Sequence, residues 1–227
     1  MASEPRSLFV TGTDTCVGKT LVSAALLHAL ARRRPRVVGM KPVAAGLVRR
    51  GEGWISEDVL ALRAASTVAV PPALDNPVAL PEPWSPHLAA ARAGRRITVA
   101  ELLAAQRALL AYAEVVLVEG AGGWRVPIND TETLADLAVA MAAPVVLVVG
   151  LRLGCLNHAL LSAEAIQADG LRLAGWVANS IDPAMQCRDG NIATLQRRLA
   201  APLLGVLPWL DAPDPRSIEL QLPEDFR

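Results

Sequence analysis

The residues best suited to carry chemistry lie near the start of the chain, in the stretch TGTDTCVGKTL at positions 11–21. It ends in Gly18, Lys19 and Thr20, which is the ending of a loop that binds nucleotide phosphates. Five residues separate Gly12 from Gly18, where the common pattern G-x-x-x-x-G-K-[ST] has four, so the stretch predicts a variant of that loop. Lys19 would supply a cation to the β- and γ-phosphates, and Thr20 a hydroxyl to Mg²⁺.

The neighbouring segments would position this loop between a strand and a helix. Residues 7–12 form an apolar run typical of a strand, and residues 19–32 have the composition of a helix. Free backbone N–H groups and the positive end of the helix dipole then converge on a bound anion. Gly18 lets the backbone approach that anion. Cys16 has two interpretations, a thiol with a depressed pKa near a helix N-terminus or a small apolar space-filler.

Two carboxylates could complete a metal site. Mg²⁺ takes octahedral oxygen ligands, so Thr20 needs partners at the ends of neighbouring strands. Glu119 ends the apolar run 114–120 and is followed by glycines, which predicts the acidic residue of a Walker-B position. Asp58 follows the expected N-cap, Ser56, at the start of an expected helix. An aspartate there is also favoured by the helix dipole alone, so both interpretations stay open.

Lys41 is the candidate for a second catalytic cation beside Lys19. It ends the apolar run 36–42, and the carboxyl edge of a parallel sheet faces the crevice in which ligands bind. Phosphoryl transfer depends mainly on positioning and on positive charge at the transferring group, which two lysines would supply. A solvated lysine is the alternative.

The chain as a whole has the pattern of an α/β fold with a doubly wound, mainly parallel sheet and helices on both faces, in a single domain over residues 1–227. Near-continuous apolar runs alternate with helical segments, as expected of strands buried on both faces. The runs lie at 7–12, 36–42, 114–120, 143–150, 173–179 and 201–208, and the helices at 19–32, 54–65, 98–113, 131–142, 156–168 and 191–200. Residues 66–96, which carry six prolines, predict a long functional excursion with one short helix near 86–94.

Composition limits the classes of partner and compartment. The 22 basic and 22 acidic residues cancel, so we expect no nucleic-acid partner. The apolar runs are too short to cross a membrane, and the first ten residues lack the pattern of a signal peptide. Cys16, Cys155 and Cys187 are far apart and odd in number, which favours a cytoplasmic protein without a disulfide or zinc framework.

Six blocks of sequence occur in the order found in dethiobiotin synthetases, and the chain resembles that family over about residues 7–210. The blocks are VTGTDTCVGKT, KPVAAG, VEGAGGW, LRLGCLNHALLSAEAI, GWVAN and LLGVLPWL. The resemblance implies a P-loop NTPase-like three-layer sandwich. It also implies an ATP-dependent cyclo-ligase that makes dethiobiotin from 7,8-diaminononanoate and CO₂ (or bicarbonate) in biotin biosynthesis, as a homodimer.

The resemblance also implies a role for each matching residue. Lys41 and Lys19 would be catalytic, and Thr20, Asp58 and Glu119 would hold Mg²⁺. The substrate would contact Ala45 and, from a partner subunit, Gly154, Cys155, Leu156 and Asn157. ATP would contact Asp58, Glu119 and the set Thr15, Cys16, Val17, Gly18, Lys19, Thr20, Leu21, Gly120, Ala121, Gly122, Asn179, Ser180, Pro208, Trp209 and Leu210.

The sequence departs from the family pattern at Ala45, where a Ser or Thr is usual, and at Cys16, where some members have Glu. Losing one neutral hydrogen bond at position 45 would cost about 0.5–1.5 kcal/mol. Trp124 has two open interpretations, a wall of the substrate crevice or an ordinary core aromatic. Two rival classes share the fold: a switch ATPase of the partitioning kind, which usually has a lysine where Asp14 stands, and a ligase with an added glutaminase domain.

Overall fold

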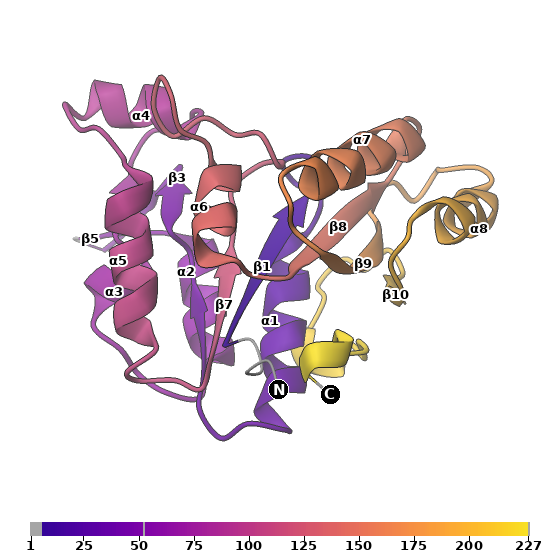
Figure 1. Cartoon of the computed structure of the whole chain (residues 1–227), viewed down its shortest axis with the longest axis horizontal. Helices are drawn as coiled ribbons and strands as arrows, with labels where there is room; N and C mark the ends of the chain where they lie inside the picture. The colour runs from indigo at the N-terminus through magenta and orange to yellow at the C-terminus, as the bar shows by residue number, and fades with distance from the viewer. Residues whose placement is uncertain (1–5, 52, 227) are drawn as a thin grey trace.

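The computed structural model describes residues 6–51 and 53–226 and has a six-stranded, all-parallel sheet at its centre (Figure 1). The strands follow the order β10-β9-β8-β1-β7-β2. All six predicted strands are present, which confirms the α/β fold class. Their bounds are β1 (Ser7–Gly12), β2 (Val37–Met40), β7 (Val115–Glu119), β8 (Val145–Leu151), β9 (Leu173–Ser180) and β10 (Leu203–Leu207).

Helices cover both faces of this sheet. The helices α1 (Lys19–Ala31) and α2 (Glu57–Ala65) pack on one face. The opposite face carries α5 (Val99–Leu109), α6 (Leu134–Met141), α7 (Cys155–Ala168) and α8 (Arg188–Arg198). The neighbouring strands β1 and β8 send the chain to opposite faces, through α1 and α7. That arrangement opens a crevice at the carboxyl ends of the strands, where ligands bind in such sheets.

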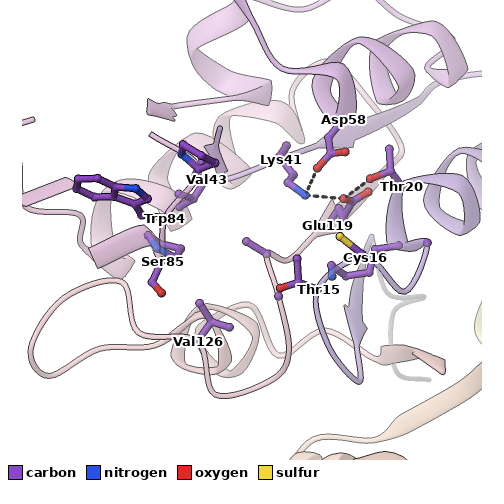
Figure 2. A pocket seen from close by; sticks show the side chains of 17 residues that line it. Thr15, Cys16, Thr20, Lys41, Val43, Asp58, Trp84, Ser85, Glu119 and Val126 are labelled. Atoms are coloured by element: carbon purple, nitrogen blue, oxygen red, sulfur yellow. Dashed lines mark hydrogen bonds and ion pairs between the residues drawn. The ribbon is translucent and has the colours of Figure 1, made fainter. Parts of the chain in front are cut away.

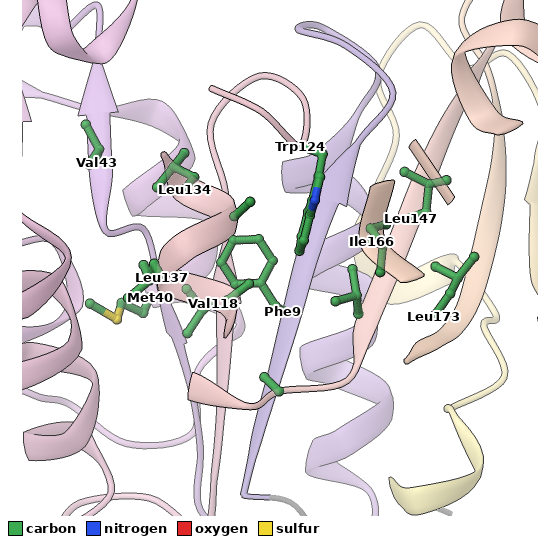
Figure 3. Close-up of a cluster of buried hydrophobic side chains, with 14 of the residues drawn as sticks. Phe9, Met40, Val43, Val118, Trp124, Leu134, Leu137, Leu147, Ile166 and Leu173 are labelled. Atoms are coloured by element: carbon green, nitrogen blue, oxygen red, sulfur yellow. The ribbon is translucent and has the colours of Figure 1, made fainter. Parts of the chain in front are cut away.

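Side-chain alternation along the strands builds a separate apolar core on each face. In β1, Leu8 and Val10 pack toward α1, whereas Phe9 points into the opposite core with Trp124 and Leu137 (Figure 3). Every residue of this strand is buried, because neighbours on both faces cover it. The near-continuous apolar run in the sequence therefore has a physical cause in two-sided burial.

Hydroxyl side chains cap the starts of α2 and α5, at α2 through Ser56 as the sequence predicted. The Ser56 hydroxyl accepts from Val59 N at 3.4 Å, and the Thr98 hydroxyl accepts from Glu101 N at 3.3 Å. The Glu101 carboxylate accepts from Arg95 Nη2 at 3.2 Å.

The proline-rich excursion is more ordered than the sequence suggested. It contains the predicted short helix, α4 (Pro86–Arg92), and also α3 (Pro72–Asp75) and β6 (Val78–Leu80). β6 pairs in parallel with β3 (Val43–Ala45), and a hairpin of β4 (Val48–Arg50) and β5 (Gly53–Ile55) follows β3. The prediction of a single helix was incomplete because three-residue strands depend on a distant partner and leave little local signal.

The tail after β10 returns across the sheet. It contains two short 3₁₀ turns, η1 (Pro215–Ser217) and η2 (Glu224–Phe226). Gln221 N donates to Leu204 O at 2.9 Å, and Phe226 is buried with the α1 core. Among the described helices, none combines the length and the apolar character needed to cross a membrane.

Candidate active site

A cavity of about 730 Å³ lies at the carboxyl edge of the sheet (Figure 2). Three separate segments bring functional side chains to it: the loop between β1 and α1, the end of β2, and the end of β7. The first turn of α2 adds Asp58. Residues 83–86 form the wall on the other side. The cavity therefore gathers residues from position 15 to position 126 of the sequence.

The phosphate loop has the backbone shape that its glycine predicted. Gly18 has a φ of 86°, in the left-handed region, and a Cβ there would lie 2.1 Å from Asn179 Nδ2. Both facts require glycine. The Asn179 amide donates to Val17 O at 2.9 Å and so ties the loop to the end of β9. The free N–H groups of the first turn of α1 face the place where an anion would bind.

Lys41 and two carboxylates meet at the floor of the cavity. Lys41 Nζ lies 2.6 Å from Glu119 Oε1 and 2.7 Å from Asp58 Oδ2. Thr20 Oγ1 donates to the same Glu119 oxygen at 2.8 Å (Figure 2). Lys41 is 5% exposed and Glu119 is fully buried, whereas the Asp58 side chain is about half exposed. The alternative of a solvated Lys41 is therefore excluded, and Asp58 does more than cap its helix.

These contacts raise the pKa of Lys41 and lower the pKa of Asp58. Burial by itself lowers the pKa of the Lys41 ammonium. Attraction first to Glu119 and then to Asp58 outweighs burial, so this pKa lies above its ordinary value of 10.5. Burial likewise raises the pKa of Asp58, and attraction to Lys41 outweighs it, so the carboxyl pKa lies below 3.8. Both groups are charged at neutral pH.

Lys19 is the second cation of the cavity, and its environment acts in the opposite direction. Burial and then repulsion by Lys41 lower the pKa of Lys19 to about 8, against weaker attraction to Glu119 and Asp58. Its ammonium donates to Asp14 O at 3.0 Å. Lys19 and Lys41 are the only lysines in the sequence, in which every other basic residue apart from three histidines is an arginine.

The oxygen donors here fit Mg²⁺. Glu119 Oε2 is buried and has no hydrogen-bond partner among the described residues, so it is available to a ligand. The Thr20 hydroxyl contacts the other oxygen of this carboxylate, and the Asp58 carboxylate shares the Lys41 ammonium with it. Within residues 6–51 and 53–226, no three His, Cys, Asp or Glu side chains gather as a metal site. A cation would therefore keep water or phosphate ligands, as Mg²⁺ does.

A family model described as an AAA domain (AAA_26) matches residues 6–217. The chain belongs to this family. The match spans every segment that lines the cavity, from the phosphate loop to Val126.

Solved structures similar to this AAA domain share its fold. They include chloroplast FtsY from Physcomitrella patens (18% identity, TM-score 0.58), the MinC:MinD cell division protein complex from Aquifex aeolicus (16%, 0.55) and a ParA family ATPase from Chlorobium tepidum TLS (12%, 0.54). The matches cover 100%, 91% and 91% of this chain, and 65%, 82% and 86% of those chains. The AAA domain thus spans just under two thirds of the FtsY chain. Family and fold together support a nucleotide-binding domain of the P-loop NTPase kind.

The far wall of the cavity contains residues that the sequence interpretation missed. Val43 and Val126 are apolar, and Ala45, which was predicted, lines the cavity with them and with residues 83–86. The missed set is Val43, Pro83, Trp84, Ser85, Pro86 and Val126. Its one signal was the run of prolines in 66–96, which marked a functional excursion without showing which residues reach the site.

A second cavity, of about 390 Å³, lies at the same sheet edge beyond β8. Ser180 and Trp209 line it together with Asp182, Pro183, Met185 and residues 187–190. The Ser180 hydroxyl is buried and has no partner among the described residues. Of the residues expected to contact ATP, Ser180 and Trp209 meet here, whereas Pro208 and Leu210 are exposed and lie outside the lining of both cavities described.

The remaining predicted contacts fall into three groups. One group, Thr15, Cys16, Ala121 and Gly122, lines the main cavity. The second group, Val17, Leu21 and Gly120, is adjacent in sequence to lining residues but is outside the lining itself. Cys16 is exposed at a φ of 58°, so its interpretation as an apolar space-filler was wrong. The third group, Gly154, Cys155, Leu156 and Asn157, starts α7 outside the lining of this chain's own main cavity, and Cys155 is buried.

Trp124 belongs to the core. It is 4% exposed, meets Phe9 edge-on with ring centroids 6.0 Å apart, and donates from Nε1 to Asp169 Oδ2 at 2.7 Å. It is absent from the lining of the main cavity described above. The interpretation as a wall of the substrate crevice was therefore wrong, because the ring turns away from the cavity into the core.

Proposed function

We propose that this AAA domain is an ATP-dependent cyclo-ligase that closes the ureido ring of dethiobiotin from 7,8-diaminononanoate and CO₂. The observation that carries the proposal is the meeting of Lys19, Lys41 and Glu119 at one end of a cavity whose other end is largely apolar. Dethiobiotin synthetases belong to the same AAA_26 family. The six sequence blocks that resemble them include the residues on which this site is built.

The chemistry needs positioned charge more than a protein nucleophile. One substrate amine adds to CO₂, loses a proton and becomes a carbamate anion. The carbamate oxygen takes the γ-phosphoryl group of ATP, which gives a carbamic-phosphoric mixed anhydride and ADP. The neighbouring amine then attacks the carbonyl carbon, phosphate leaves, and a five-membered cyclic urea forms. This closure is intramolecular, for which effective molarities of about 10⁵ M or more are known.

The chain's own residues would keep two anions together during phosphoryl transfer. Lys19 and the amides at the start of α1 would bind the β- and γ-phosphates, and Lys41 would lie between the γ-phosphoryl group and the carbamate. Thr20, Asp58 and Glu119 would hold Mg²⁺, which would supply further positive charge to the phosphate oxygens. Burial of Lys19, Lys41 and Glu119 strengthens their electrostatic interactions, because little water screens them.

The opposite wall would bind the hydrocarbon part of the diamine. Val43, Val126 and Pro86 give this end of the cavity an apolar surface. Ala45 contributes a methyl group where the family usually has a hydroxyl, so the substrate amine or carbamate would lose one hydrogen bond there. The expected cost, about 0.5–1.5 kcal/mol, weakens substrate binding and leaves the chemistry intact.

We further propose a homodimer in which the start of α7 from a partner subunit binds the substrate carboxylate. Gly154 has a φ of 96° with open space around it, and the neighbouring Leu153 is 95% exposed. Free amides at a helix start favour an anion. The nucleotide base would lie in the second cavity, near Asn179, Ser180 and Trp209.

A switch ATPase remains the main rival, because MinD and ParA share the fold. Such proteins usually have a lysine early in the phosphate loop. Here Asp14 occupies that place and forms an ion pair with Arg152. That pair favours the ligase, since an acidic side chain cannot act as a cation toward a neighbouring subunit's phosphates.

A reconstituted reaction tests the proposal. The purified chain is mixed with diaminononanoate, bicarbonate, Mg²⁺ and ATP, and dethiobiotin and ADP are measured by mass spectrometry. We expect equal amounts of both products, and none when the diamine, the bicarbonate or Mg²⁺ is left out. ADP formation that ignores the diamine but responds to a membrane or a protein partner would favour the switch ATPase instead.

A further inference from the structure

The backbone of Lys41 is held by a segment from the proline-rich excursion. The pairing of β2 with β7 ends at Met40, opposite Val118. One residue later, Lys41 N donates to Asp75 O at 2.8 Å, and Asn76 Nδ2 donates to Lys41 O at 2.7 Å. Both backbone groups of Lys41 are therefore bound by consecutive residues of a distant segment.

This segment is itself fixed by an ion pair between the buried Asp75 carboxylate and the partly exposed Arg63 guanidinium. The Asp75 carboxylate, on a residue that is 2% exposed, accepts from Arg63 Nε and Nη2, each at 2.6 Å. Such two-pronged pairs hold geometry as well as charge. The Asn76 amide also donates to Val78 O at 3.1 Å, which fixes the direction in which it points. Asp75 and Asn76 thus have little freedom to move relative to Arg63.

Arg63 connects this arrangement to the metal side of the cavity, because it lies on α2 together with Asp58. Asp58 contacts the Lys41 ammonium from the first turn of that helix. The same helix therefore holds Lys41 at both ends, at the ammonium through Asp58 and at the backbone through Arg63 and Asp75. A shift of α2 or of the 75–76 segment would move the ammonium relative to Glu119.

We propose that Arg63, Asp75 and Asn76 are positioning residues that hold Lys41 in place for phosphoryl transfer. This inference rests on the proposed function, in which Asp58 and Glu119 become metal ligands. When they do, they share their negative charge with Mg²⁺ and hold the ammonium less tightly. The backbone contacts from Asp75 and Asn76 then keep Lys41 at the transferring group. Their loss should therefore lower kcat more than it raises KM for ATP.

Two variants test this role by kinetics. Asn76→Ala removes the donor to Lys41 O, and Arg63→Lys keeps the charge but loses the two-pronged contact. We expect kcat to fall about tenfold or more in Asn76→Ala, and less in Arg63→Lys, because small misplacements of a catalytic group are costly. KM for ATP should change by less than about threefold, since the phosphate loop is untouched.

A spectroscopic measurement follows Lys41 without any substrate. Protein labelled with ¹³Cε-lysine shows two lysine side chains, because the sequence has only Lys19 and Lys41. A Lys19→Arg variant assigns them. In Asn76→Ala we expect the Lys41 resonance to move while that of Lys19 moves much less. A purely structural contribution of Asn76 would lower the melting temperature and leave both resonances in place.

Asp225→Asn is the matched control. It removes an aspartate–arginine pair, with Arg172, that lies away from the cavity, and it should change neither kcat nor the lysine resonances. If both folded variants keep kcat within about twofold of the original chain, the positioning role is wrong. If Asn76→Ala does not fold, Arg63→Lys decides. If the original chain makes no dethiobiotin, the proposed function fails, and an unmoved Lys41 resonance would then overturn the positioning role separately.

Discussion

Lys19 and Lys41 face the same cavity, but the molecule holds them in different ways. Lys19 begins α1, and its ammonium contacts the carbonyl of Asp14, five positions earlier in the chain. Lys41 depends on Asp58, Asp75 and Glu119, which lie 17 to 78 positions away. One lysine is placed by its own loop, and the other by the tertiary structure.

This difference appears in the pKa values. Lys19 lacks a carboxylate contact among the described ion pairs, so burial and the neighbouring Lys41 lower its pKa to about 8. Lys41 is at least as deeply buried, yet Glu119 and Asp58 raise its pKa. A buried lysine thus keeps or loses its proton according to whether the fold brings an anion to it.

The largest expected effect comes from removing the lysine that the tertiary structure places. In Lys41→Ala we expect kcat for dethiobiotin formation to fall on the order of 10²–10³, because a preorganised cation at the transferring group is lost. Steady-state kinetics would measure it, with circular dichroism as a folding check, since Glu119 loses its buried partner. A near-normal kcat would contradict the role assigned to Lys41.

The two lysines should also make opposite contributions to stability at high pH. The pKa of Lys19 is about 8 in the folded chain and 10.5 as an ordinary lysine, so the unfolded chain binds more protons between those values. The free energy of unfolding should therefore rise with pH across this window, by about 3 kcal/mol from Lys19. Lys41 has a raised folded pKa, so its stabilisation is complete below 10.5 and is lost only above it.

Urea unfolding at pH 8 and pH 10 measures the Lys19 effect. Lys19→Met is the reference, because it lacks the titrating group and should gain less stability over the same interval. Equal gains in the two proteins would mean that Lys19 has an ordinary pKa.

Asn179→Ala tests whether the phosphate loop depends on a contact from a distant part of the chain. The substitution removes the amide that donates to Val17 O from the end of β9. We expect ATP to bind about 3- to 10-fold more weakly in calorimetry, which corresponds to one hydrogen bond. Asn129→Ala removes a similar contact, to Ile97 O, and serves as the control. An unchanged affinity in Asn179→Ala would mean that the loop binds ATP without support from β9.

The smallest effect should come from Trp124, which lies beside the cavity but points into the core. Trp124→Phe keeps the ring against Phe9 and removes the donor to Asp169. We expect the free energy of unfolding to drop by about 1 kcal/mol, with kcat unchanged. A fall in kcat at unchanged stability would instead support the interpretation of Trp124 as part of the substrate site.

Much of the fold and part of the site could be predicted from the sequence. The six strands were predictable because burial on both faces leaves apolar runs, such as residues 143–150. Lys19 and Thr20 were predictable because their chemistry is tied to local spacing. Residues 83–86, Asn76 and Arg63 were not, because their partners lie far away in the sequence and no local pattern marks them. Trp124 was ambiguous for the same reason, since a tryptophan after the glycines could face either the cavity or the apolar core.

The sequence by itself determined that the chain has a phosphate loop on a parallel sheet, since both depend on short-range spacing and on the period of apolar residues. Only the tertiary structure decided which charges meet. It buried Lys41 against Glu119 and Asp58, left Lys19 without a contact to any carboxylate in residues 6–51 and 53–226, and turned Trp124 toward the core. The reason is physical: electrostatic energy depends on distance through space and on burial, and the order of the residues alone gives neither.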